Sequence, residues 1–262
     1  MKQGFLIPVY NGHGKTAGLM VKKLSRHNLP IIIVDDGSDR ETKESLSAIV
    51  ADCPLTMRVT LAKNKGKGGA LSAGIDKAHE LGLTRVLQLD ADEQHDIERT
   101  GFFLEQSRLH PESMICSYPE YDDSVPAIRK NGRKIANMWA NIVTLSHDMT
   151  DVMCGFRVYP VEPVWRIIHR HHLDQRMGFE TEILIRLHWN RIPLLFYPVR
   201  VTYPAGGVSH YRLVRDNIRI TWMFIRLFFG MICRSPLIIS RRIRRTPQRC
   251  GEGGVCEQRE QH

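Results

Sequence analysis

Short apolar runs alternate with longer helical patterns over the first 120 residues. Runs that read as strands are Phe5–Val9, Ile31–Val34, Met57–Leu61, Val86–Leu89 and Met114–Ser117. Helical patterns lie between them at 14–27, 40–50, 68–81 and 97–109. Because strands that alternate with helices usually pair in parallel, the pattern predicts an α/β fold with a doubly wound, mostly parallel sheet and helices on both faces.

The pattern changes after residue 120. Residues 118–131, which contain several Pro and Asp, are predicted as a loop. Helices are predicted at 133–146, 162–171 and 178–190, and a strand at 194–203. These elements would complete one domain over residues 1–212.

The segment 213–245 is predicted to form basic amphipathic helices. Arg219, Arg226 and Arg234 share one helical face, and the far side carries Phe224, Phe228 and Met231, with Leu227 at its border. This pattern is typical of a helix in a membrane interface, since the uncharged stretches are too short to span a bilayer. The alternative is a helix packed on the sheet with a solvated basic tail. Residues 246–262 are predicted to be disordered.

Charge and cysteine content limit the partners and the compartment. The chain has a net charge of +9, and residues 205–262 hold 11 Arg and 4 acidic residues. Such asymmetry indicates a polyanionic partner, either an anionic membrane or a nucleic acid. The first apolar run is too short for a secretory signal, and the six Cys form no CxxC pair. We therefore expect a cytoplasmic protein, peripheral on the inner face of the cell membrane.

Two carboxylates follow directly on the predicted strand 86–89. Asp90 and Asp92 stand two residues apart, with Gln94 and His95 close behind. Ligands bind outside the carboxyl ends of parallel strands, where two such oxygens can hold Mg²⁺ or Mn²⁺ on a diphosphate. The alternative is a solvated acidic loop.

Two further segments follow predicted strands. Asp35-Asp36-Gly37-Ser38 can hydrogen-bond a ribose or base, or cap the next helix. The Lys- and Gly-rich segment 63–69 opens a helix, whose first N–H groups favour an anion. Gly14-Lys15-Thr16 is not a P-loop, because Val9 stands where that motif needs Gly.

In order and spacing, four motifs resemble family-2 glycosyltransferases, particularly the dolichol-phosphate mannosyltransferase-like branch. They are Pro8-Val9-Tyr10-Asn11, Val34 to Ser38, Asn64 to Gly68, and Asp90 to His95. Asp151 with Cys154-Gly155-Phe156-Arg157, then Phe179 to Glu182 and Gly207 to His210, extend the likeness, which covers residues 4–212.

The resemblance implies a GT-A fold and sugar transfer from a nucleotide-diphosphate sugar to a lipid-linked or other membrane acceptor. The implied metal ligands are Asp90, Asp92 and Gln94. Asp36 would contact the nucleoside, and Arg129 and Arg133 are candidates for binding an acceptor or diphosphate. The full set of expected substrate-binding residues is Pro8, Tyr10, Asn11, Asp36, Gly66, Lys67, Asp90, Ala91, Arg129, Arg133 and Arg212.

The acceptor decides whether a catalytic base is needed. A hydroxyl acceptor needs one, with Asp151 as first candidate and Glu182 as second. Glu180 and Glu182 cannot share a helix face, so at most one should point into the site. A phosphate acceptor needs little or no base, and the sequence leaves both possibilities open.

Two other classes of function compete with this reading. One is a nucleotidyltransferase, which would release pyrophosphate. The other is a non-catalytic nucleic-acid-binding module, which would leave the strand-end acids unexplained, so no nucleic-acid partner is expected. The four tryptophans, at 139, 165, 189 and 222, are expected to be packing residues.

Overall fold

The computed structural model describes the chain except residues 93, 122–126, 202–212 and 245–262. The strands are β1 (Gln3–Val9), β2 (Ile31–Asp35), β3 (Thr56–Thr60), β4 (Arg85–Gln88), β5 (Met114–Tyr121), β6 (Arg157–Pro160) and β7 (Leu194–Val201). The α-helices are α1 (Gly14–Leu24), α2 (Arg40–Asp52), α3 (Lys67–Glu80), α4 (Thr100–Leu109), α5 (Ala127–Thr144), α6 (Val161–Arg170), α7 (Phe179–Trp189) and α8 (Leu213–Arg244). Short 3-10 helices are η1 (Ser25–His27) and η2 (Ile97–Arg99).

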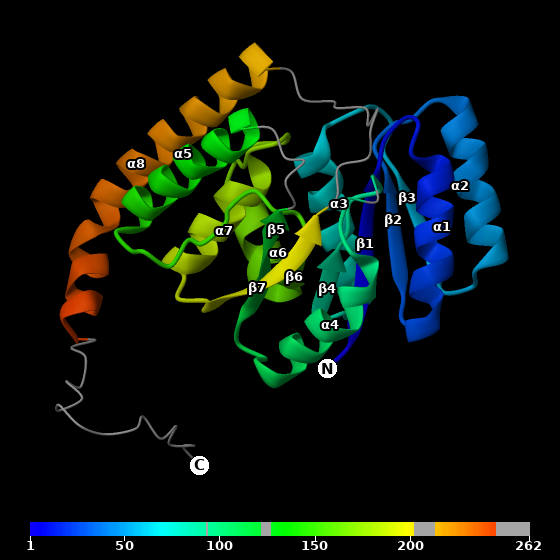
Figure 1. Ribbon diagram of the computed structural model, residues 1–262, viewed down its shortest axis with the longest axis horizontal. Coiled ribbons are helices and arrows are strands. Elements are labelled where there is room, and N and C mark those ends of the chain that lie inside the picture. Colours follow the sequence, from blue (N-terminus) through cyan, green and yellow to red (C-terminus); the bar gives the residue numbers. More distant parts are fainter. Residues whose placement is uncertain (93, 122–126, 202–212, 245–262) are drawn as a thin grey trace.

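The strands form a mixed sheet in the order β3-β2-β1-β4-β6-β5-β7 (Figure 1). Strands β1 to β4 are parallel to one another, and so are β5 and β7. Strand β6 lies antiparallel between β4 and β5. This arrangement confirms the predicted α/β fold and places the carboxyl ends of β1, β2 and β4 at one edge of the sheet.

Helices cover both faces of the sheet, each over its own core. In β2, Ile32 and Val34 face the core under α3 and α5 to α8, whereas Ile31 and Ile33 face the core under α1, α2 and α4. Side chains alternate across a strand, so a central strand between two helical layers must be apolar on both sides. This requirement explains the continuous apolar runs in the sequence.

Between residues 118 and 160 the structure differs from the predicted elements. Tyr118–Tyr121 extend β5 and residues 127–131 open α5, so the described parts of 118–131 are not loop. Strand β6 was not predicted. It has four residues, all buried, and its first is Arg157, a residue type that seldom lies fully buried.

Helix α8 belongs to the same core as the sheet, which corrects the expectation of a separate segment after residue 212. Met223, Phe224, Leu227 and Met231 are buried among residues of α5 and α7. The face predicted to enter a membrane is therefore largely the face that packs inward. Among the described residues, no helix combines the length and apolarity needed to cross a membrane.

Candidate active site

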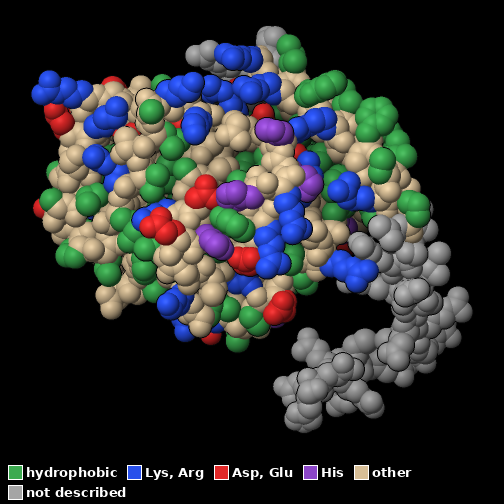
Figure 2. All heavy atoms as spheres, turned by 180° about the vertical axis from the view of Figure 1, so that it is seen from behind, with side chains coloured by type: hydrophobic (Ala, Val, Ile, Leu, Met, Phe, Trp, Pro, Cys, Tyr) green, Lys and Arg blue, Asp and Glu red, His purple; other side chains and the backbone are tan. Residues whose placement is uncertain are grey.

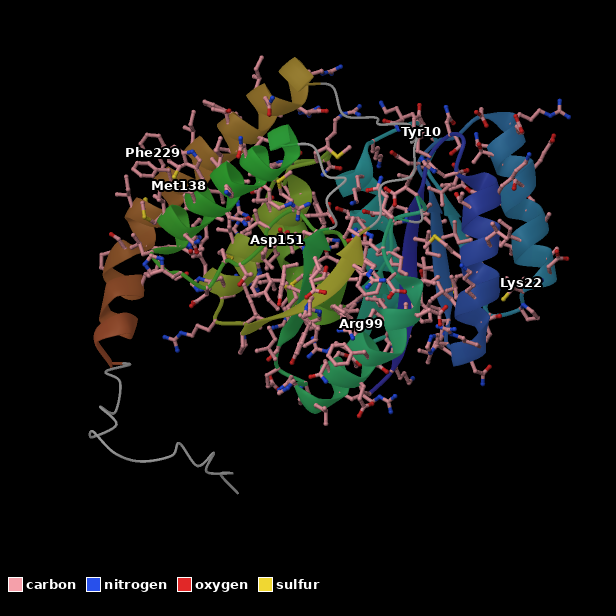
Figure 3. All side chains as sticks on the ribbon, viewed as in Figure 1. Tyr10, Lys22, Arg99, Met138, Asp151 and Phe229 are labelled. Carbon is pink, nitrogen blue, oxygen red and sulfur yellow. The ribbon has the colours of Figure 1, made fainter. Side chains whose placement is uncertain are left out.

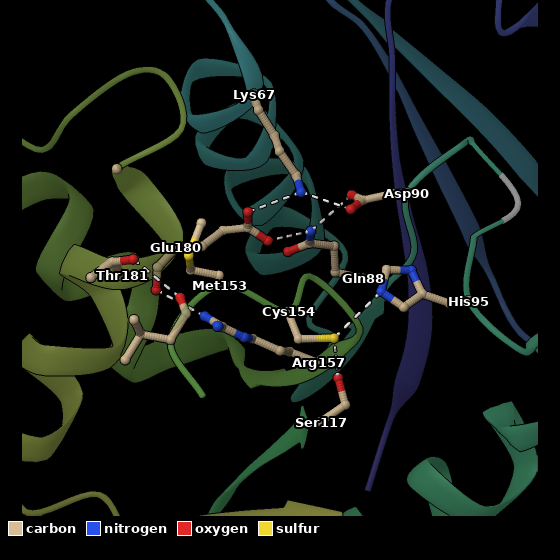
Figure 4. A network of polar contacts seen from close by, with 12 residues as sticks. Lys67, Gln88, Asp90, His95, Ser117, Met153, Cys154, Arg157, Glu180 and Thr181 are labelled. Carbon is tan, nitrogen blue, oxygen red and sulfur yellow. Dashed lines mark hydrogen bonds and ion pairs between the residues drawn. The ribbon is translucent and has the colours of Figure 1, made fainter. Parts of the chain in front are cut away.

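A half-buried ion-pair network lies at the carboxyl end of β4. The ammonium of Lys67, at the start of α3, is 2.8 Å from Asp90 Oδ2 and 2.9 Å from Glu180 Oε2 of α7. Gln88 Nε2 donates to Glu180 Oε1 at 2.8 Å and to Asp90 Oδ1 at 3.2 Å (Figure 4). Elements far apart in the sequence thus fix the orientation of the Asp90 carboxylate.

The charges of this network stabilise one another. Burial alone lowers the pKa of Lys67, but Asp90 and Glu180 outweigh burial and raise that pKa. Burial disfavours the charged form of Asp90, yet the nearby cations and hydrogen bonds hold its pKa below the usual value. Both groups are therefore charged at neutral pH.

Gly155 lets the backbone pass close to this network. A Cβ atom there would lie 2.6 Å from Asp90 Oδ2 and 2.9 Å from Glu180 Oε1. Any side chain at residue 155 would push these carboxylates apart. The Cys154-Gly155-Phe156-Arg157 motif therefore has a packing reason for its glycine.

Asp92 is the carboxylate best placed to receive a cation. Its Oδ1 accepts the backbone N–H of Gln94 at 3.1 Å, and it makes no other hydrogen bond among the described residues. Burial and the charge of Asp90 raise the pKa of Asp92, and they outweigh the Gln94 N–H, His95 and Lys67, which lower it. Mg²⁺ typically takes one or two carboxylates and completes its shell with water and phosphate oxygens. Asp92, Asp90 and the Gln94 amide carry oxygens of that kind, and their binding of a cation stays a prediction.

His95 and the buried Cys154 form a second polar pair beside Asp90. His95 Nε2 is 3.4 Å from Cys154 Sγ, which also accepts from Ser117 Oγ at 2.9 Å. Burial lowers the pKa of His95, but Cys154 and the two aspartates outweigh burial and raise it to about 9. His95 also lines a cavity of about 280 Å³ with Asp90, Met20 and Lys23.

Asp36 holds the glycine loop in place. Its carboxylate accepts Asn64 Nδ2 at 3.0 Å and the N–H groups of Lys65 and Gly66 at 2.7 and 2.8 Å. Gly66 has φ +90, and a Cβ there would lie 2.8 Å from Gln175 O. The loop therefore requires glycine at this position. The expected contact of Asp36 with a nucleoside stays a prediction.

Asp151 lies buried at the junction of α5 and the 151–154 turn. Arg133 Nη1 donates to Asp151 Oδ2, and Oδ1 accepts the N–H groups of Met153 and Cys154. The structure thus joins two sequence-predicted site residues. Both oxygens of Asp151 are occupied, and its side chain is 2% exposed.

Glu182 does not face the Lys67 network, and this corrects its expected place in the site. Its Oε1 accepts Arg186 Nη2 at 2.7 Å, and Oε2 accepts Arg226 Nη2 at 2.9 Å and the N–H of Asp174 at 3.0 Å. The side chain is completely buried. The glutamate that does face Asp90 is Glu180, which the helix pattern left as one of two possibilities.

The other predicted residues occupy several places. Pro8 lies in β1 opposite Val34, one residue before the strand ends, and Asn11 Oδ1 accepts the N–H of Asp39 at 2.8 Å. Tyr10 is half-buried just beyond β1 (Figure 3), and Ala91 is packed in the core. Arg129 is in α5, and Arg212 lies outside the described residues. Sequence reasoning missed Gln88, because nothing marks one polar residue of a buried strand as functional.

Replacing Glu182 by Gln is expected to destabilise the fold by about 3–5 kcal/mol, because two arginines would lose a buried counter-charge. Thermal unfolding measures this change. The control is Glu162→Gln, which breaks exposed pairs with Arg166 and His79 and should change stability little. An unchanged melting temperature with lost turnover would instead assign Glu182 to catalysis.

The seven-stranded mixed sheet with helices on both faces has the GT-A fold. Glucosyl-3-phosphoglycerate synthase from Mycobacterium tuberculosis, solved with Mn²⁺ and UDP-glucose, aligns with a TM-score of 0.62 over 88% of this chain and 79% of its own, at 13% identity. S. aureus TarS bound to UDP-GlcNAc aligns with a TM-score of 0.56 over 88% of this chain and 66% of its own, at 13% identity. These likenesses establish the fold.

Residues 5–181 match the family model described as glycosyl transferase family 2. The match covers more than half of the chain, so the protein belongs to this family and is a glycosyltransferase. Membership in an enzyme family decides against the nucleotidyltransferase and the non-catalytic module.

Similar curated proteins are named for transfer to lipid phosphates. The UDP-N-acetylglucosamine–dolichyl-phosphate N-acetylglucosaminyltransferase of Methanococcus voltae is 24% identical over 87% of this chain and 96% of its own length. The dolichyl-phosphate beta-glucosyltransferase of Dictyostelium discoideum is 26% identical over 78% of this chain and 66% of its own length. The undecaprenyl-phosphate 4-deoxy-4-formamido-L-arabinose transferase of Yersinia pestis is 27% identical over 65% of this chain and 52% of its own length. The chain thus spans about half to two thirds of the latter two relatives.

Proposed function

We propose that this glycosyltransferase moves a sugar from a nucleotide-diphosphate sugar to a polyprenyl phosphate, with a divalent cation and with inversion at the anomeric carbon. The names of the similar curated proteins support this acceptor class. The observation that carries the proposal is the state of Asp151 and Glu182, the two carboxylates considered as bases.

Neither carboxylate is open to a hydroxyl group. Both are buried, and each is paired with arginine and with backbone N–H groups. A hydroxyl acceptor must lose a proton as it attacks, whereas a phosphate monoester is already an anionic nucleophile. A site whose candidate bases are occupied therefore favours a phosphate acceptor.

On the donor side, Asp92, Asp90 and Gln94 would hold Mg²⁺ or Mn²⁺. The cation would neutralise charge on the leaving diphosphate. Lys67 lies beside Asp90 and adds positive charge at the start of α3, where N–H groups also favour phosphate oxygens. Asp36 and Gly66 hold the loop that presents Lys67.

A polyprenyl acceptor resides in a bilayer, so the enzyme must meet the membrane surface. We place it as a peripheral protein on the cytoplasmic face of the cell membrane, where nucleotide sugars are available. The basic C-terminal region supports an anionic surface as the partner.

The test incubates the full chain with UDP- and GDP-sugars, Mn²⁺ and undecaprenyl or dolichyl phosphate in detergent. Expected products are a nucleoside diphosphate and a lipid-linked sugar whose anomeric configuration is inverted, as read by NMR. Nucleoside diphosphate release that ignores polyprenyl phosphate but responds to a hydroxyl acceptor would refute the proposal.

Asp151→Asn is expected to raise KM for the polyprenyl phosphate and to leave kcat within about tenfold, because its carboxylate positions Arg133. Steady-state kinetics separate the two constants. Asp148→Asn, at an exposed aspartate three residues earlier, is the matched control for a lost negative charge. A kcat loss of about 10²–10⁴-fold would instead identify Asp151 as a general base.

A further inference from the structure

Most exposed large hydrophobic side chains of the described residues gather on two helices, α5 and α8. Scattered surface hydrophobics are normal, but contiguous apolar patches mark interaction surfaces. Sequence reasoning singled out α8 alone and chose another face of it.

One stripe runs along α5. Its members recur at spacings of three and four residues, which places them on one side of the helix. They are Ile135, Met138, Trp139 and Ile142, with exposed fractions between 38% and 56%. Ala140 and Val143, on the opposite side, are completely buried in the core.

A second stripe runs along α8 with the same periodicity. Its main members are Ile218, Trp222, Ile225, Phe229 and Ile232, all between 41% and 64% exposed. The inward side of the same helix carries Met223, Leu227 and Met231. Helix α8 is thus apolar on two sides, of which the core uses one.

The two stripes adjoin. Helices α5 and α8 pack together, with the ring centroids of Trp139 and Phe224 6.3 Å apart. Met138 and Phe229 lie on these neighbouring helices (Figure 3). From behind, apolar side chains follow the edge of the molecule where α8 lies, with Lys and Arg beside them (Figure 2). We call this surface the α5–α8 apolar face.

Positive charge accompanies the apolar face. Helices α5 and α8 carry 11 Lys and Arg and one acidic residue, Asp216, which is buried. The rest of the chain holds 26 basic and 27 acidic residues. The net charge of the protein therefore resides on the two helices that expose apolar side chains.

We propose that the α5–α8 apolar face docks onto an anionic lipid bilayer. Exposed Trp, Phe and Ile beside Lys and Arg match the boundary between acyl chains and anionic head groups. A second copy of the chain fits less well, because two faces of like charge would meet. The proposal rests on the proposed function, since a polyprenyl phosphate lies in such a bilayer.

The α5–α8 apolar face lies on the opposite side of α5 from the Arg133–Asp151 pair. Helix α5 carries Trp139 on its outer side and Arg133, which meets Asp151, toward the interior. A bilayer on the outer side would lie one helix away from Arg133. An acceptor could keep its polyprenyl chain in the bilayer while its phosphate reaches the site.

The test measures sedimentation of the full chain with vesicles of phosphatidylcholine, with and without phosphatidylglycerol. Trp222→Ser with Phe229→Ser removes two exposed side chains of α8. The matched control, Leu19→Ser with Leu109→Ser, removes two equally exposed side chains from α1 and α4, on the other side of the sheet. All three proteins should share one melting temperature.

The wild type should bind anionic vesicles, and more weakly at high salt. The affinity of the α8 variant for these vesicles should fall on the order of tenfold or more, because two apolar side chains are lost. The control should bind like the wild type. Equal binding by the α8 variant would overturn the proposal. The proposal would also be overturned if the wild type bound no vesicles but self-associated, and if the α8 variant lost that self-association.

Transfer to a short, water-soluble prenyl phosphate separates this proposal from the proposed function. An enzyme that glycosylates the soluble acceptor but ignores anionic vesicles would refute the docking surface alone. An enzyme that binds vesicles but glycosylates no polyprenyl phosphate would refute the proposed function and leave the surface standing.

Discussion

Asp92→Asn is expected to abolish sugar transfer, by about 10³-fold or more, while leaving the melting temperature unchanged. Asp92 makes one local hydrogen bond to the Gln94 N–H, which an Asn oxygen can still accept. The substitution therefore removes a charge without disturbing the fold. That charge would hold the cation on the diphosphate, which supplies several kcal/mol of stabilisation.

Two measurements are needed for Asp92→Asn. Coupled release of nucleoside diphosphate reports transfer, and electron paramagnetic resonance reports Mn²⁺ binding without turnover. Asp96→Asn is the control, because Asp96 accepts the N–H of Glu98 nearby and is not an expected ligand. Near-wild-type turnover of Asp92→Asn at saturating Mn²⁺ would remove the metal site from the mechanism.

Ending the chain after Tyr211 is expected to unfold the domain rather than to release it in soluble form. Met223, Phe224, Leu227 and Met231 would be lost from the core. Each buried side chain of this size contributes about 1.5–3 kcal/mol, and a domain is stable by only about 5–15 kcal/mol. Glu182 would also lose Arg226.

Circular dichroism and gel filtration test this expectation. A chain that ends after Arg244 keeps α8 and should fold like the intact protein. If the chain that ends at Tyr211 is monomeric and melts at the temperature of the intact protein, α8 contributes nothing to the core. A purely interfacial α8, as the sequence pattern predicted, would give that result.

Strands β2 and β4 and the acids at their carboxyl ends were predictable, because both features follow from the local pattern. A strand buried on two faces must be continuously apolar, as in Ile31–Val34, and polar residues after such a strand must lie at the sheet edge. Asp36 and Asp90 were found in this way. Their partners Asn64 and Lys67 were placed only as a loop at a helix start.

The orientation of α8 was not predictable, because distant residues decide it. A helix pattern assigns arginines to solvent unless acidic partners are known. Arg226 pairs with Glu182, and Arg219 lies 3.6 Å from Asp174. These pairs turn the arginine side toward the protein and leave Trp222 and Phe229 outside. The expectation that Trp222 packs was wrong for the same reason, since it is 62% exposed.

Strand β6 has a consequence for the order in which the chain can assemble. Strands β1 to β4 all lie within the first 88 residues, and β3, β2 and β1 find their sheet partners there. The far edge of β4 pairs with Arg157–Pro160, which leave the ribosome much later. During synthesis that edge, which is buried in the finished protein, stays unpaired, and an unpaired edge can recruit other chains. Nascent chains shorter than about 160 residues would therefore need chaperones to bind this edge, whereas the finished protein does not need them.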